Sequence, residues 1–208
     1  MIAQPAARDP HANAPARELI LGSTSVYRKS LLARLDIPFS VVSPQVDETP
    51  LAGEAPEQLA LRLAMAKAVA VARLHPDAVV IGSDQVADLN GEPLGKPGTH
   101  DRAVAQLTRM SGRAVVFQTA VAVVCQATAF SRVELAQVSV QFRHLTPAEI
   151  EAYLLRERPY DCAGSAKSEG LGIALLDRID NDDPTALVGL PMIRTCRLLR
   201  EAGIAVLP

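Results

Sequence analysis

Apolar residues along the chain are spaced in two ways, and each spacing predicts one kind of element. Short apolar runs that stop at small or polar residues indicate buried strands, here at 18–25, 39–42 and 78–84. Apolar residues at every third or fourth position predict helices, here over 27–35, 55–74, 100–110 and 191–202. Because alanine has the highest helix propensity, the alanine-rich stretch 55–74 is the most regular of these helices.

The second half of the chain is richer in strand-forming runs than the first. Two long β-like stretches, 114–125 and 133–142, follow each other and are expected to pair antiparallel. Thr146, with a proline after it and Glu149 three positions on, is typical of a capped helix start. A short strand is predicted near 173–176. Since helices and strands alternate early while strands cluster later, we expect an α/β fold with a mixed sheet.

The first 17 residues differ from the rest because they are rich in alanine and proline, and we expect them to be disordered. Residues 18–208 are long enough for a single domain, which can have two lobes. Nothing in the chain resembles a signal peptide, and no apolar run reaches the roughly 20 residues that cross a bilayer. We therefore expect a cytoplasmic protein with no membrane partner.

Composition, net charge and cysteine spacing indicate which classes of partner and chemistry to expect. Hydrophobic residues make up 49% of the chain and charged residues 21%, which are globular values. The formal net charge of -2 argues against a nucleic-acid partner, but a local basic cluster could still bind a phosphorylated small molecule. The three cysteines form no C-x-x-C pair, which favours reduced thiols and gives no reason to expect nucleophilic catalysis by Cys162.

Small hydroxyl residues follow the first predicted strand, at the start of a helix. Ser23 and Ser25 stand there, with Arg28 one turn into the helix. Backbone N–H groups and the helix dipole favour an anion at such a place, and an arginine can clamp a phosphate with two hydrogen bonds. The alternative interpretation is an ordinary helix cap followed by surface basic residues.

Acidic and basic residues gather in other loops. Glu48 lies in a loop beside prolines, and Asp84 ends an apolar strand. Two such carboxylates facing a polyphosphate typically hold Mg²⁺, and one of them can act as a base toward water. Taken singly, Asp84 can equally be a turn-forming residue. Three lysines can be interpreted in two ways: Lys67, Lys96 and Lys167. Each by itself is most simply a solvated surface residue. Together with the carboxylates and Arg28, they resemble the groups that bind a triphosphate–metal complex.

The order and spacing of these clusters resemble the Maf family of nucleoside triphosphate pyrophosphatases. The resemblance covers about residues 18–204, and its motifs lie at 19–32, 44–49, 67–68, 81–86, 95–97, 163–170 and 187–191. It implies an elongated mixed sheet flanked by helices, as in Maf and ITPase-like folds, with a nucleotide cleft between two lobes. It also implies cleavage between the α- and β-phosphates with Mg²⁺ or Mn²⁺, and a homodimer.

The resemblance carries roles onto individual residues. Asp84 takes the position of the general base and Glu48 that of the second essential carboxylate, so these two residues are the expected metal ligands. The positions expected to contact phosphates or order the site are Ser23, Arg28, Lys67, Lys96 and Lys167.

Three further positions separate subgroups of the family by nucleotide base. Gln85 and Glu169 resemble the subgroup that acts on 7-methyl-GTP, whereas those for dTTP and UTP typically carry Thr and Gln there. Tyr27 stands where that subgroup usually has Trp. The chemistry agrees, because an aromatic ring attracts the positive charge of 7-methylguanine and a carboxylate can accept hydrogen bonds from its N1–H and N2–H₂ groups.

Two other readings stay open at this point. The same reaction can use dTTP, UTP or another purine triphosphate, or the chain can be a nucleotide-binding regulator of cell division without catalysis. The intact set of carboxylates favours catalysis, since a pure binding module has no evident need for them. The acidic run 180–183 is interpreted as a solvated turn.

Overall fold

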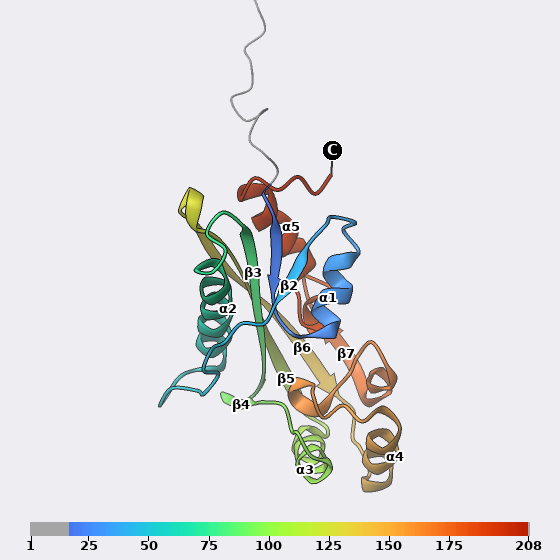
Figure 1. Ribbon diagram of the computed structural model, residues 1–208. Coiled ribbons are helices and arrows are strands. Elements are labelled where there is room, and N and C mark those ends of the chain that lie inside the picture. The colour runs from blue at the N-terminus through green and yellow to red at the C-terminus, as the bar shows by residue number, and fades with distance from the viewer. Residues whose placement is uncertain (1–16, 208) are drawn as a thin grey trace, which may run out of the picture.

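The computed structural model describes residues 17–207, and its centre is a seven-stranded mixed sheet with the order β2-β1-β3-β5-β6-β7, to which β4 adds by pairing with β3 (Figure 1). The strands are β1 (Leu19–Gly22), β2 (Ser40–Val42), β3 (Val79–Leu89), β4 (Glu92–Leu94), β5 (Ala114–Cys125), β6 (Phe130–Phe142) and β7 (Leu176–Asp180). The disorder expected for residues 1–17 concerns positions that, apart from Arg17, lie outside the described residues.

Pairing directions confirm the mixed sheet. Strand β1 runs parallel to both β2 and β3, whereas β3, β5, β6 and β7 are joined by antiparallel pairs. The two long stretches predicted to pair antiparallel are β5 and β6, although β6 begins at Phe130, before the expected residue.

Strand β3 is longer than predicted, and this changes the place of Asp84. Its parallel partner β1 ends opposite Gly82, but its antiparallel pairing with β5 continues to Asp88. The polar residues after Ser83 were expected to end the strand. That prediction was wrong because β5 supplies backbone partners for them, so Asp84 lies inside a strand, just beyond the point where β1 ends.

Helices cover both faces of the sheet at one end and gather at the other end (Figure 1). The helices are α1 (Val26–Ala33), α2 (Pro56–Ala72), α3 (His100–Met110), α4 (Pro147–Glu157) and α5 (Met192–Glu201). Helix α2 closes one buried apolar cluster on the sheet, and α1 and α5 close a second on its opposite face. A third cluster joins α3 and α4 to the far halves of β5 and β6. Within the described residues no helix is long and apolar enough to span a bilayer.

Close packing of α2 on β3 prepares the site. Gly82 lies directly beneath α2, and a Cβ at this position would come within 2.3 Å of the backbone oxygen of Ala64. The absence of a side chain therefore lets the helix approach the strand closely. As a result Lys67, one turn further along α2, reaches Asp84 on β3.

Two predictions near the end of the chain were wrong. Residues Leu171–Leu175 form 3₁₀ turns, and the strand begins only at Leu176. The reason is that the N–H groups of Gly170 and Gly172 both bond to the carbonyl of Lys167, which keeps this segment coiled. The run 180–183 is exposed except for Asp183, which is fully buried rather than solvated because its carboxylate has partners inside the protein.

Candidate active site

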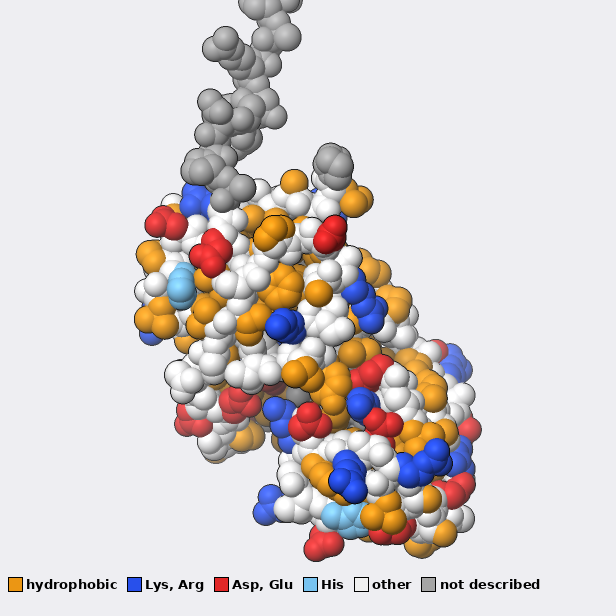
Figure 2. All heavy atoms as spheres, turned by 45° about the vertical axis from the view of Figure 1, so that its right-hand side comes forward, with side chains coloured by type: hydrophobic (Ala, Val, Ile, Leu, Met, Phe, Trp, Pro, Cys, Tyr) orange, Lys and Arg blue, Asp and Glu red, His pale blue; other side chains and the backbone are white. Residues whose placement is uncertain are grey.

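A cavity of about 320 Å³ lies where α2 and β3 meet several loops. These are the loop that follows β1 and the loops near residues 96, 162 and 188. Figure 2 shows the surface hollowed between the upper and lower parts of the molecule, with charged side chains of both signs around the hollow. The predicted site residues that line the cavity are Ser23, Tyr27, Arg28, Glu48, Lys67, Gln85, Lys96 and Glu169. Asp84 and Lys167 are not part of the lining, but each lies next to a residue that is: Asp84 is bonded to Lys67, and the Lys167 ammonium lies over the ring of Tyr27.

The turn after β1 is both a helix cap and a polar wall of the cavity. Ser25 caps α1 by accepting a hydrogen bond from the N–H of Arg28, at 3.4 Å. Arg28 turns back over this turn, where its Nε donates to the carbonyl of Gly189 at 2.8 Å and its Nη1 lies 3.5 Å from the Ser23 hydroxyl. Burial lowers the pKa of Arg28, while the negative charges of Asp84 and Glu48 act in the opposite direction. The guanidinium is thus held at the cavity wall by a backbone carbonyl and a serine hydroxyl.

Lys67 joins the two predicted catalytic carboxylates. Its Nζ lies 2.6 Å from Oδ1 of Asp84 and 2.7 Å from Oε1 of Glu48. Lys67 and Asp84 are 5% and 7% exposed, so their attraction is only weakly screened by water, whereas the Glu48 side chain is about half exposed. The structure therefore brings together three residues from α2, β3 and the loop before α2.

The two carboxylates have opposite pKa shifts. Burial raises the pKa of Asp84, and its two cationic neighbours only partly offset this effect. For Glu48 burial also raises the pKa, but the hydrogen bond and the charge of Lys67 bring it below its ordinary value. A pair of acids whose environments separate their pKa values is typical of sites that divide acid–base roles between two groups.

The donor set around Lys67 bears on the metal question. Asp84 and Glu48 supply hard carboxylate oxygens, and both contact the ammonium group of Lys67. The described residues contain no group of three or more His, Cys, Asp or Glu that could hold a metal. Mg²⁺ is commonly held by one or two carboxylates, with its other positions filled by substrate phosphates and water. The residues present therefore fit a divalent cation that enters together with a polyphosphate, rather than one caged by the protein alone.

An aromatic ring marks another wall of the cavity. The Nζ of Lys167 lies 5.5 Å from the centre of the Tyr27 ring and is paired with Glu157 at 2.8 Å. Burial raises the pKa of Tyr27 to about 12 and that of the neighbouring Cys162 thiol to about 12. Because a thiol with such a pKa stays protonated at neutral pH, Cys162 is a poor nucleophile. Glu169 is exposed and lines the same cavity.

The amide of Gln85 is oriented by a segment whose role the sequence reasoning missed. Its Nε2 donates to the carbonyls of Ala186 and Leu187, at 2.9 and 3.0 Å, and also lies 2.9 Å from the hydroxyl of Thr119. Residues 187–191 were recognised as a motif but received no function. The signal available in the sequence was the glycine at position 189. The structure shows why a glycine stands there, because its φ of 117° lies in the region that favours glycine.

Lys96 completes the cationic lining. It is exposed in the loop that follows β4, and its positive charge contributes to the lowered pKa of Glu48. Lys67, Lys96 and Arg28 thus surround one acidic group from three separate parts of the chain.

Comparisons with known proteins show which family this chain is similar to. A family model described as Maf-like protein matches residues 18–202. A 7-methyl-GTP pyrophosphatase of Albidiferax ferrireducens is 71% identical over 92% of this chain and 96% of its own length. Proteins with the same name from Polaromonas sp. and Bordetella pertussis are 70% and 57% identical, covering 92% and 90% of this chain and 87% and 93% of their own. Among solved structures, a HAM1 protein from Coxiella burnetii shows a slight likeness, with a TM-score of 0.43, 15% identity, and coverage of 61% of this chain and 73% of its own.

Proposed function

Because this chain belongs to the Maf family, we propose that it is a nucleoside triphosphate pyrophosphatase that hydrolyses 7-methyl-GTP to 7-methyl-GMP and pyrophosphate. The observation that carries the proposal is the cluster of Lys67 with Asp84 and Glu48 at the wall of a cavity that also holds Tyr27 and Glu169. Relatives that cover nearly the whole chain at 70% and 71% identity bear the name of this activity.

In this proposal the cationic residues bind the triphosphate. Arg28 and Lys96 line the cavity from different elements and can neutralise phosphate oxygens, and Ser23 lines the same cavity with a hydroxyl group. A divalent cation, Mg²⁺ or Mn²⁺, held by Glu48 and Asp84 together with the substrate, would add charge neutralisation to the phosphates. Phosphoryl chemistry depends mainly on such positioning and charge stabilisation.

Asp84 supplies the general base. At neutral pH its carboxylate takes a proton from a water molecule as that water forms a bond to the α-phosphorus. The bond from the α-phosphorus to the oxygen that bridges it to the β-phosphorus breaks, and pyrophosphate leaves with the bonding electrons. Lys67 keeps the side chain of Asp84 oriented through the 2.6 Å contact. The raised pKa of Asp84 makes it a stronger base than an ordinary aspartate.

The base of the nucleotide is read at Tyr27, Gln85 and Glu169. The Lys167 ammonium over the Tyr27 ring shows that this ring already faces a positive charge. A positively charged 7-methylguanine stacked on Tyr27 would gain the same kind of attraction. Glu169 can accept hydrogen bonds from the N1–H and N2–H₂ groups of guanine.

The test is pyrophosphate release by the purified protein with Mg²⁺ or Mn²⁺ and 7-methyl-GTP, GTP, dTTP, UTP, CTP or ITP. We expect a clear preference for 7-methyl-GTP. A preference for a pyrimidine nucleotide would overturn the substrate, and no release from any nucleotide would overturn the enzymatic function in favour of a binding protein.

The cytoplasmic location and the homodimer expected from the sequence stay predictions. Cell fractionation tests the first. Size-exclusion chromatography with light scattering tests the second, and a monomer at micromolar concentration would contradict it.

A further inference from the structure

Asp183 is a buried carboxylate that the proposed mechanism does not use. It is 0% exposed, and it comes shortly after β7, in the loop that leads to α5. Its Oδ2 accepts a hydrogen bond from the backbone N–H of Arg194 at 3.1 Å and lies 3.6 Å from Nη1 of the same residue. A buried carboxylate is costly unless it is paired and hydrogen-bonded, so these contacts hold the loop firmly against α5.

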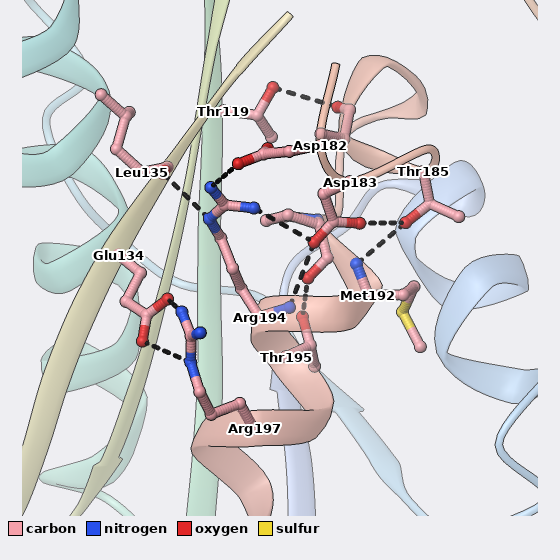
Figure 3. Close-up of polar contacts among 12 residues, drawn as sticks. Thr119, Glu134, Leu135, Asp182, Asp183, Thr185, Met192, Arg194, Thr195 and Arg197 are labelled. Carbon is pink, nitrogen blue, oxygen red and sulfur yellow. Dashed lines mark hydrogen bonds and ion pairs between the residues drawn. The ribbon is translucent and has the colours of Figure 1, made fainter.

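Arg194 extends this attachment to the sheet. Figure 3 shows its guanidinium between the acidic loop and β6, with Asp183 pointing toward it. Its Nε donates to the carbonyl of Leu135 at 3.0 Å, and its Nη2 is paired with the exposed carboxylate of Asp182 at 3.0 Å. The first turn of α5 is thereby tied both to the loop and to strand β6.

Thr185 closes the same loop from its other side. Its hydroxyl accepts a hydrogen bond from the N–H of Met192 at 2.8 Å and lies 3.3 Å from the carboxylate of Asp183 (Figure 3). The same hydroxyl lies 2.8 Å from the carbonyl of Leu190, its nearest acceptor. Together with Asp183 it caps α5, whose own N-cap residue, Pro191, makes no side-chain cap bond. The segment between Thr185 and Met192 is consequently held at both ends.

This held segment carries the carbonyls that orient the cavity side chains. The carbonyl of Gly189 accepts from Nε of Arg28 at 2.8 Å, and the carbonyl of Ala186 accepts from Nε2 of Gln85 at 2.9 Å. The hydroxyls of Ser83 and Thr119 bond to the same two carbonyls, at 3.0 Å each. Any movement of residues 186–189 would therefore move a proposed phosphate-binding residue and a proposed base-reading residue at once.

We propose that Asp183 and Thr185 are positioning residues for nucleotide binding, which act through the carbonyls of 186–189 on Arg28 and Gln85. The inference rests on the proposed function for the roles of those two residues. Asp84 stands apart from it, because pairing of β3 with β5 and the contact with Lys67 hold that carboxylate in place. The contacts of Asp183 and Thr185 should thus govern substrate affinity far more than the chemical step.

The test compares Asp183→Asn with Asp182→Asn in steady-state kinetics with 7-methyl-GTP. The control makes the same substitution one residue away and removes a contact to the same arginine, but at a side chain that is 71% exposed. We expect Asp183→Asn to raise KM about 10-fold with kcat kept within about two-fold, the scale of a misplaced binding group. The control should leave both parameters near those of the wild type.

A residue that merely stabilises the fold would give a different result. It would lower the fraction of active protein, and so the apparent kcat, without changing KM. A fall in kcat at unchanged KM, or no change in either parameter, would therefore overturn the proposal. Thermal unfolding of each variant, followed by circular dichroism, gives the stability of the protein independently.

A second pair of variants decides the matter if Asp183→Asn does not fold. Thr185→Val keeps the shape of the side chain but removes the hydroxyl, and Thr185→Ser restores it. We expect the valine variant to raise KM and the serine variant to return it to the wild-type value; equal KM values for the two would contradict the positioning role of Thr185. Should the wild type release no pyrophosphate, the proposed function fails alone, and the same comparison is made on the dissociation constant of 7-methyl-GTP by calorimetry.

Discussion

Replacing Asp84 by asparagine separates nucleotide binding from catalysis. The substitution keeps the size of the side chain and removes a negative charge from a position that is 7% exposed. Lys67 keeps its other partner, because Glu48 lies 2.7 Å from the ammonium. The phosphate-binding side chains therefore stay in place, while the group that would take a proton from water is lost.

The expected magnitude follows from these contacts. Loss of a positioned general base lowers kcat by about 100-fold or more, which corresponds to about 2.7 kcal/mol in the activation free energy. Measured without a divalent cation, the dissociation constant of the nucleotide should stay within a few-fold of the wild-type value or decrease, since one charge that repels the triphosphate is gone. Because Lys67 stays paired with Glu48, the free energy of unfolding should fall by only about 1–2 kcal/mol, less than when a buried charge is left alone.

The pH profile adds a second signature. Burial raises the pKa of Asp84 in the protein without a bound cation, and only the ionised carboxylate can act as a base, so kcat/KM, which reports the free enzyme, should rise with pH as this carboxylate ionises. This acidic limb should be absent from the residual activity of Asp84→Asn.

The assay combines pyrophosphate release with calorimetric binding of 7-methyl-GTP. The matched control is Asp88→Asn, which makes the same substitution on the same strand at a carboxylate that accepts the N–H of Gly91 in the turn after β3. The control should keep wild-type turnover. More than about one tenth of wild-type kcat in Asp84→Asn, or a loss of binding equal to the loss of turnover, would refute the assignment of the base.

Four further outcomes are expected. Lys67→Met leaves two neighbouring carboxylates without their shared cation, and it should lower the free energy of unfolding at pH 7 by about 3 kcal/mol in urea denaturation; an unchanged midpoint would contradict the role of the ion pairs. Glu169→Gln should lower kcat/KM for 7-methyl-GTP about 10-fold more than for UTP, and equal losses on both nucleotides would argue against base reading. Hydrogen bonds from Thr146 and Arg143 lower the pKa of Glu149 to about 2, so its stabilising contribution is present above pH 4.5 and is lost as the pH falls toward 2. Glu149→Gln should consequently flatten the fall of Tm over that range, and an unchanged slope would count against it. Removal of divalent cations with EDTA should abolish pyrophosphate release, and Mg²⁺ or Mn²⁺ should restore it; full activity in EDTA would exclude a metal requirement.

Local elements of this protein were largely predictable from the sequence. The capping box of Thr146 and Glu149, the alanine-rich α2 and the strands β5 and β6 all appear where the residue pattern placed them, within a few residues. Such features depend on hydrogen bonds and side-chain contacts between near neighbours in the chain, which a single sequence displays directly. The ordered motifs likewise identified the family.

The tertiary structure decided which of these residues meet. Lys67 reaches Asp84 because Gly82 lets α2 pack directly on β3, a contact between segments that no local pattern reveals. Polar residues at 84 and 85 looked like the end of a strand, yet β3 continues since β5 pairs with it there.

Packing between segments far apart in the chain also explains why the interpretation of the acidic run 180–183 as a solvated turn failed at Asp183. Asp183 looked solvated because its sequence neighbours are polar, but Arg194 of α5 supplies its partners and buries it. By itself the sequence determined the elements, the family and the chemical groups available. Packing between distant segments determined their burial, their partners and the shifts in their pKa values, because a side chain's environment is made mostly by residues far from it along the chain.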